Sequence, residues 1–511
     1  MTTSLSITDH LVIAPVLLPF VAALLLLVLR EQAMRLQRGL AVLAVLVQIG
    51  FALALLLAVA DGTLVTYRLG DWPAPWGIVL VADRLAASMV LITSLVALCA
   101  VIYAGGGTDR QGRHFHVLFQ MQLFGLAGAF LTGDLFNLFV FFEVLLIASY
   151  GLALHGGGPA RTRAGLHYVV MNLLGSTVFL FAAGLIYSAL GSLNLADLAA
   201  KAATLPADSL GLARAGGLLL LLVFGLKAAL LPLHLWLPNA YAGTSAPVAA
   251  LFAIMTKVGI YAILRTHTLL FGSAAGELAG LFEPWLLALA LATLVIGMLG
   301  ALAAEGLGRL AAYLVLASVG TLLAAIALGT NGIAAGLYYL PHSTFTAALM
   351  FLLSDAIKRR RARSGDSFAP DVDMPHYAQW GGVYFVAAVA ASGLPPLSGF
   401  VGKLLILQAT PAHPWVWVII LVSALGIVVA LARAGSRVFF DSVKPPSSIN
   451  QALSRPTPLF APYEFFAIGA LLGLILALTV GAGPAVDFAR ATALQLAEPS
   501  IYINAVLGGT R

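Results

Sequence analysis

Apolar runs of about eighteen or more residues recur along the whole chain, and they constrain its fold more than any other feature of the sequence. A run of this length can cross the hydrocarbon core of a bilayer as one helix. Only 9% of the 511 residues are charged, against about 25% in an ordinary soluble protein. Since so few charges cannot cover a soluble surface, the sequence predicts an all-α polytopic membrane protein.

Hydropathy averaged over about 19 residues predicts about fourteen transmembrane helices. They are expected at residues 11–29, 40–60, 78–103, 116–133, 135–154, 165–190, 212–232, 246–269, 281–303, 309–330, 333–354, 380–408, 415–436 and 464–483. No segment between them is long enough to form a soluble domain. Residues 1–511 are therefore predicted to form a single membrane domain.

Basic residues in the predicted loops indicate the orientation of the chain. If the N-terminus lies outside, the cytoplasmic loops hold seventeen Lys and Arg residues and the opposite loops hold seven. The run from Lys358 to Arg363 is then a cytoplasmic loop. Because cytoplasmic loops carry the excess of basic residues, we expect a multi-pass protein of the cell inner (plasma) membrane with both termini outside.

Four ionisable side chains fall inside the predicted spans: Glu143, Lys227, Lys257 and Lys403. An ionised group at that depth costs at least about 2.5–3.5 kcal/mol, and one carboxylate cannot neutralise three ammonium groups. All three basic groups are lysine, whose pKa falls readily on burial, whereas arginine stays charged. The pattern favours a proton path over structural ion pairs, with Glu143 and Lys227 as the candidate pair that exchanges a proton.

Prolines accompany two of these lysines. Pro232 and Pro238 follow Lys227 in the seventh span, and Pro395 and Pro396 precede Lys403 in the twelfth. Proline removes a backbone donor and clashes with the preceding turn, so both helices are expected to break. Backbone groups freed at membrane depth are tolerated only beside a protein-buried or water-filled cavity. Both breaks therefore predict polar pathways.

The two broken spans, seven and twelve, suggest an internal repeat. Five crossings reverse the direction of the chain, so a five-helix repeat with this spacing must be inverted, as in many ion transporters. We take residues 116–269 as the first inverted repeat and residues 281–436 as the second. Two histidines, His234 and His342, lie within or beside spans near prolines and polar residues. They join the candidate site, His234 in a supporting role.

Missing motifs narrow the chemistry. The sequence contains no GxxxxGK[ST] phosphate-binding loop and no GxGxxG after a strand, and its one cysteine, Cys99, lies inside an apolar run. ATP hydrolysis, nicotinamide binding and iron–sulfur chemistry are therefore not expected in this chain. Its histidines also lack a convincing spacing for haem or zinc. We predict no cofactor and no metal.

Three segments resemble the antiporter-like membrane subunits shared by Mrp-type cation/proton antiporters, respiratory complex I and membrane-bound hydrogenases. They are GDLFNLFVFFE, which ends at Glu143, LKAALLPLHLWLPNAYAGTSAPVAALFAIMTKVGIYAILR, which contains Lys227 and Lys257, and SGLPPLSGFVGKLL, which contains Lys403. Within this family the chain looks most like the MrpD-type branch of the Na+/H+ antiporters. The resemblance covers about residues 80–440.

The resemblance implies fourteen helices, inverted repeats and both termini outside. It also implies a proton-input pair at Glu143 and Lys227, a relay through Lys257 and His342, and an exit near Lys403. The partners it implies are other subunits of a hetero-oligomeric membrane complex, protons and monovalent cations, and the lipid bilayer. Nucleic acid is not expected as a partner.

Three functions remain open from the sequence. The first is the proton-translocating subunit of a multi-subunit monovalent cation (Na+)/proton antiporter, which is a secondary transporter subunit and not an enzyme. The alternative is the proton-pumping membrane subunit of an NADH-quinone oxidoreductase or membrane-bound hydrogenase. The third is a passive assembly scaffold. The transported cation, and whether it passes through this chain, are not fixed by the residues.

Overall fold

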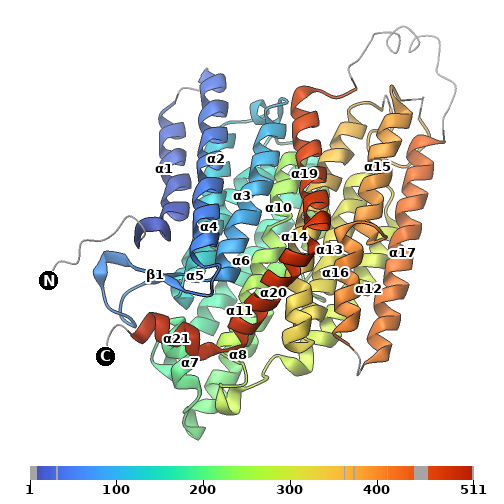
Figure 1. Ribbon diagram of the computed structural model, residues 1–511. Helices are drawn as coiled ribbons and strands as arrows, with labels where there is room; N and C mark the ends of the chain where they lie inside the picture. Colours follow the sequence, from blue (N-terminus) through green and yellow to red (C-terminus); the bar gives the residue numbers. More distant parts are fainter. Residues whose placement is uncertain are drawn as a thin grey trace, which may run out of the picture.

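The computed structural model describes residues 9–29, 33–361, 363–371, 374–410, 413–441 and 459–508. Its long helices run side by side and form one bundle (Figure 1). The chain termini lie outside the described residues, so their predicted orientation stays a prediction. Predominance of helix confirms the predicted all-α fold class.

The first eight predicted spans each fall on a helix or a broken pair of helices. These are α1 (Ala14–Val28), α2 (Met34–Ala58), α3 (Arg84–Ala104), α4 (Phe115–Leu131), α5 (Leu135–Leu154), α6 (Pro159–Leu190), α8 (Ala207–Ala228), and α10 (Ala246–Phe252) with α11 (Met255–Leu269). Apolar residues on nearly every face explain why these helices pack against one another and against lipid.

The other six spans follow in the same way. They are α12 (Glu283–Ala303), α13 (Leu307–Ile326), α14 (Gly329–Lys358), α15 (Tyr377–Ser392) with α16 (Ser398–Gln408), α17 (Pro414–Phe439) and α19 (Pro462–Val480). Within the described ranges, ten helical stretches are long and apolar enough to cross a membrane, and three shorter apolar helices accompany them. Since each of the fourteen predicted spans coincides with a helix or a broken pair of helices, the predicted architecture of about fourteen membrane helices is confirmed.

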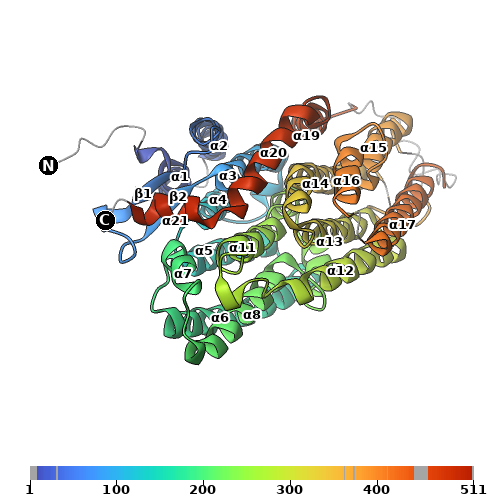
Figure 2. The same ribbon diagram turned by 60° about the horizontal axis from the view of Figure 1, so that its bottom comes forward.

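Several short elements were not predicted. They are η1 (Asp9–Leu11), β1 (Val65–Arg68), η3 (Leu69–Asp71), β2 (Val79–Ala82), η4 (Thr108–Arg110), α7 (Leu195–Ala202), α9 (Trp236–Gly243), η5 (Gly276–Leu278), α20 (Ala482–Ala497) and α21 (Pro499–Leu507). Strands β1 and β2 form an antiparallel hairpin in which Val65 pairs with Ala82. After α19 the chain runs obliquely through α20 and then along α21 (Figures 1 and 2), contacting α14, α11 and α7.

The predicted break after Lys227 is present. Helix α8 ends at Ala228, because Ala229 adopts a left-handed backbone conformation with φ 61°. A turn containing Pro232 then leads into α9. Pro238 does not break a helix, contrary to the prediction, because it lies in the first turn of α9, where no backbone donor is needed.

The predicted break before Lys403 is also present. Helix α15 ends at Ser392, Gly393 has φ 73°, and α16 begins at Ser398 after Pro395 and Pro396. A second kind of break was not predicted: the span at 246–269 divides into α10 and α11 without any proline at the division. The boundaries of the two inverted repeats stay a prediction.

An ion pair at one end of the bundle ties the second helix to the fourth. Arg38 Nε lies 2.6 Å from Asp109 Oδ2, and His116 Nε2 lies 3.2 Å from the same oxygen. Burial disfavours the charged form of Asp109, but the hydrogen bonds from His116 and Arg38 outweigh it and lower the pKa of Asp109 to about 2. The carboxylate therefore stays ionised and holds α2 against α4.

Candidate functional site

The five residues predicted for proton transfer lie on five helices. They are Glu143 on α5, Lys227 on α8, Lys257 on α11, His342 on α14 and Lys403 on α16. Helices α8, α11, α14 and α16 follow one another across the bundle (Figure 2). The helices that carry Lys227, Lys257, His342 and Lys403 thus follow one another in the order that the predicted route requires, and the roles of the residues stay a prediction.

Residues of α6 bridge the predicted input pair. Among the described residues no ion pair joins Glu143 directly to Lys227. Instead, Ser176 Oγ donates a hydrogen bond to Glu143 Oε1, and Lys227 Nζ donates to Asn172 Oδ1 at 3.3 Å. Ser176 and Asn172 lie one turn apart on α6, and Ser176 Oγ also lies 3.1 Å from the Asn172 backbone oxygen. The carboxyl and the amine thus each contact a polar side chain of α6, and these two side chains lie one helical turn apart.

The two members of this pair differ in burial. The Lys227 residue is 7% exposed, whereas Glu143 is only half-buried. Val140 and Ile147, one turn before and one turn after Glu143, are exposed on the same face of α5. Glu143 therefore lies deep in the apolar run, as predicted, but toward the outer face of the bundle. An intramembrane carboxylate in that position needs a proton, a polar partner or water.

A small cavity adjoins Lys227. Its volume is about 10 Å³, close to the space that one water molecule requires. It is lined by Lys227 and Asn172, and by Met255 and Val258 of α11. Gly259 allows α11 to approach α8, because a Cβ there would lie 2.5 Å from the Ala228 nitrogen. The cavity therefore opens from Lys227 toward the helix that carries Lys257.

Lys257 lies in the first turn of α11 and is fully buried. Its Nζ donates a hydrogen bond to Ser318 Oγ of α13 at 3.1 Å. Thr321 lies one turn further along α13 and donates from Oγ1 to the Ala317 backbone oxygen at 2.9 Å, and Tyr339 lies on the adjacent helix α14. The ring of Tyr339 in turn lies 5.6 Å from the His342 ring. Helices α13 and α14 thus carry hydroxyl groups between the residues that hold Lys257 and His342, and the hydroxyls of Ser318 and Thr321 donate to the backbone of α13.

His342 lies at the break between α15 and α16. Its Nδ1 is 2.8 Å from Ser398 Oγ at the start of α16, and its Nε2 is 3.2 Å from the Ala390 backbone oxygen near the end of α15. Lys403 crosses the same break from the other side, donating from Nζ to the backbone oxygen of Ser392 at 2.6 Å. Helix carbonyl ends attract cations, so the break holds a basic side chain on each side.

The supporting residues form the turns around these contacts. Pro232 and His234 lie between α8 and α9, where Leu231 N donates to Thr293 Oγ1 at 2.9 Å. His234 Nδ1 is buried without a hydrogen-bond partner in the described part of the chain. No contact given for these residues joins His234 to the row from Glu143 to Lys403. Pro395 and Pro396 are exposed between the two half-helices.

Sequence reasoning missed the uncharged members of the site. Asn172, Ser176, Ser318 and Ser398 each contact one of the predicted ionisable groups. A signal was present for two of them, because Asn172 and Ser176 are polar, are spaced by one helical turn and lie within an apolar run. Over the ranges that the structure describes, no three His, Cys, Asp or Glu side chains gather as a metal site would require.

The side chains from Glu143 to Lys403 are of types that can exchange hydrogen bonds and protons. Serine hydroxyls both donate and accept, imidazole does so through its two nitrogens, and an amine can carry or release a proton. The Asn172 amide orients the Lys227 amine rather than carrying a proton itself. Water in the cavity beside Lys227 would complete the connection toward α11. The arrangement therefore places groups that can hold and exchange a proton on several helices of the bundle, and their roles stay a prediction.

Comparison with known proteins gives consistent similarities over most of the chain. A family profile described as NADH:quinone oxidoreductase/Mrp antiporter, TM, matches residues 132–428. The D subunit of a probable K(+)/H(+) antiporter of Rhizobium meliloti is 41% identical, and the alignment covers 98% of each chain. The D subunit of a Na(+)/H(+) antiporter of Alkalihalophilus pseudofirmus is 34% identical, and the alignment covers 98% of this chain and 99% of the relative. A solved chain of the Mrp complex from a Dietzia species superposes with a TM-score of 0.87 at 27% identity, over 98% of this chain and all of that one.

Proposed function

The chain belongs to the family of membrane subunits shared by NADH:quinone oxidoreductases and Mrp antiporters, and we propose that it is the proton-translocating subunit of a multi-subunit monovalent cation/proton antiporter. The predicted family resemblance is thereby confirmed. Relatives that match almost the full length are named as the D subunits of antiporters, which supports a transporter subunit rather than an enzyme.

We infer a proton route that follows the row of contacts. A proton enters at Glu143, crosses to Lys227 by way of the Ser176 hydroxyl and water along α6, while Asn172 orients the Lys227 amine, and reaches Lys257 through water beside α11. From Lys257 it passes Ser318 and the hydroxyls between α13 and α14 to His342. Lys403, at the break between α15 and α16, is the exit. The proton-motive force supplies about 2.3 kcal/mol per charge per 100 mV.

The contacts of Glu143 and Lys227 with polar side chains one turn apart on α6 are the observation that carries this proposal. A passive scaffold would not require a carboxyl group on the outer part of α5 to be linked to a buried amine. A redox-driven pump would use the same contacts with a different drive. Antiport is favoured because the relatives that match over their whole length carry antiporter names. The names of these relatives include both K+ and Na+. We propose Na+ as the transported cation, and the experiment below tests both ions.

Cation-dependent pH change in membrane vesicles that contain the complete complex tests the function. Glu143→Gln keeps the size of the side chain but cannot release a proton, so Na+- or K+-dependent proton movement should fall to background while the subunits still co-purify. Glu277→Gln is the matched control, since Glu277 is exposed and lies outside the row. Wild-type exchange in Glu143→Gln vesicles would contradict the proposal, and pH change that follows electron transfer rather than cations would favour the redox alternative.

A further inference from the structure

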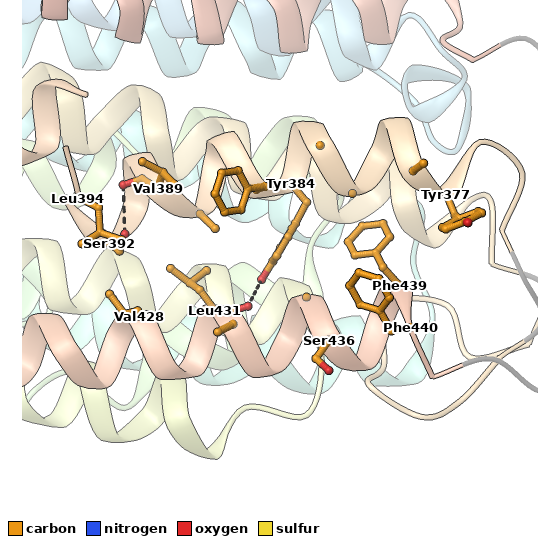
Figure 3. Close-up of a pocket in the computed structure, with 17 residues that line it drawn as sticks. Tyr377, Tyr384, Val389, Ser392, Leu394, Val428, Leu431, Ser436, Phe439 and Phe440 are labelled. Atoms are coloured by element: carbon orange, nitrogen blue, oxygen red, sulfur yellow. Dashed lines mark hydrogen bonds between the residues drawn. The ribbon is translucent and has the colours of Figure 1, made fainter. Parts of the chain in front are cut away.

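An apolar groove of about 640 Å³ runs between α15 and α17 (Figure 3). Tyr384 spans the two helices beneath it and donates from its hydroxyl to the Leu431 backbone oxygen at 2.8 Å. Val389 and Val428 face each other from its two walls. Gly382 leaves the groove open, because a Cβ built there would have no other heavy atom within 4 Å. The space is therefore a feature of the backbone and not of one side-chain rotamer.

Along most of its length the groove opens on an apolar face. Phe385 and Val386 of α15 and Leu425 and Val429 of α17 are all exposed beside it. In a membrane-spanning bundle a face of this kind meets either lipid or the apolar helix of another subunit. No part of the proton row lies on this outer face.

The width of the groove excludes a helix. Helices α15 and α17 touch across it through the Tyr384–Leu431 hydrogen bond and through the rings of Tyr384 and Phe439, whose centroids are 5.5 Å apart. A helix with its side chains is about 10–12 Å wide, so it cannot enter a groove that these contacts close at the bottom. One extended hydrocarbon chain can.

The two ends of the groove differ in polarity. The hydroxyl groups of Tyr377 and Ser436 lie at one end, together with exposed Phe440, and aromatic side chains mark membrane–water interfaces. Arg437 follows Ser436 and is 56% exposed, and it pairs with Asp441 at 3.6 Å; within the described ranges that is its one ion pair, which occupies only some of its five donors. From Tyr377 to Ser392 the groove spans fifteen residues of helix, about 22 Å, enough to pass through one leaflet.

We propose that this groove binds one acyl chain of an anionic phospholipid, with the phosphate beside Arg437 and the end of the chain beside Ser392. The polar end and the apolar length match the two parts of such a lipid. Ser392 is also the residue whose backbone oxygen accepts the Lys403 ammonium. A bound acyl chain would cover the lipid-facing side of the hydrogen bond between Lys403 and Ser392 and keep water from reaching it from the bilayer.

Photo-cross-linking tests the site directly. The complete complex is reconstituted in vesicles containing phosphatidylglycerol with a diazirine near the end of one acyl chain, and labelled peptides are mapped by mass spectrometry. Label is expected on α15 and α17. Gly382→Leu should remove it by filling the groove without a clash, whereas Gly469→Leu on α19, where a Cβ also meets nothing within 4 Å, should leave it unchanged.

Arg437→Gln tests the phosphate contact. Labelling by phosphatidylglycerol should weaken about fivefold, the effect of one basic residue near an anionic lipid, while labelling by phosphatidylcholine should not change. Equal labelling of wild-type and Gly382→Leu complexes would overturn the proposal. So would capture of a partner subunit, instead of lipid, by a photoreactive side chain placed at Phe385. Because the readout is lipid attachment, it does not depend on whether the complex exchanges cations.

Discussion

Glu143 and Lys227 do not contact each other directly, and Ser176 lies on the helix between them. Its hydroxyl contacts both the Glu143 carboxyl and the backbone of α6 at Asn172. Glu143 and Lys227 were predictable because charges in apolar runs are costly. For Ser176 the sequence shows only its one-turn spacing from Asn172, since a serine in a helix commonly bonds to its own backbone and gives no sign of its tertiary partner. The sequence thus predicts the charged ends of the site better than what lies between them.

Ser176→Ala should slow cation-dependent proton movement about tenfold, because hydrogen bonds to charged groups contribute about 1.5–3 kcal/mol. Thr177→Ala is the matched control, since Thr177 is the next residue, is exposed and bonds only to the Leu173 backbone among the contacts described. Initial rates in vesicles measure both variants. Equal rates for the two alanine variants would show that Ser176 has no part in the transfer.

Lys227→Arg should be inactive although it keeps the positive charge. Arginine does not release its proton in proteins, whereas a buried lysine can. Vesicle transport and subunit co-purification measure the variant together, with Lys201→Arg as a control, because Lys201 is a surface lysine paired with Asp197. Normal turnover in Lys227→Arg would mean that Lys227 serves as a fixed charge.

At the scale of elements, the interrupted helices differ in how far the sequence predicts them. The prolines that follow the ends of α8 and α15 make these ends predictable, because proline cannot continue a helix. The division between α10 and α11 carries no such residue. There the hydroxyl of Tyr241, from α9, donates to the Phe252 backbone oxygen at 2.8 Å. A carbonyl at the division is thus satisfied by a side chain from another helix, a tertiary contact that no local pattern contains.

Gly399→Ala tests the packing of α16 against α14. A Cβ at Gly399 would lie 2.5 Å from His342 Nε2 and 2.8 Å from the Ala390 backbone oxygen, so the half-helix or the imidazole must shift. We expect transport to fall at least about tenfold, since small displacements of a reacting group are costly. Gly473→Ala on α19, where a Cβ meets nothing within 4 Å, should behave as wild type. Undiminished transport by Gly399→Ala would show that His342 tolerates displacement.

At the scale of the whole molecule, hydropathy predicts the crossings and their order, but not the tail that follows them. Helices α20 and α21 are too short and too polar to be recognised as spans, and their positions depend on distant contacts. The clearest of these is around Arg265, which is buried, pairs with Asp83 at the start of α3 and lies 5.4 Å from the Tyr502 ring of α21. This cluster joins helices from the beginning, middle and end of the chain.

Asp83→Asn should destabilise the fold by about 3–5 kcal/mol, because it leaves the buried Arg265 without its counter-charge. Thermal unfolding of the purified complex in detergent measures the loss. The double variant Asp83→Asn with Arg265→Gln should recover part of it, since no unpaired charge remains. A double variant less stable than Asp83→Asn alone would contradict this account of the pair.

The hydrogen bonds of the three lysines on the proposed proton route bear on the turnover rate of the protein. Lys227, Lys257 and Lys403 each donate to an uncharged oxygen, from an amide, a hydroxyl and a peptide group respectively. A neutral amine still has two hydrogens and can keep the same bond after deprotonation. A carboxylate in that place would instead trap the charge. Each lysine can thus alternate between its two states without swinging to a new acceptor, so turnover would be limited by the arrival of water and not by movement of the side chains.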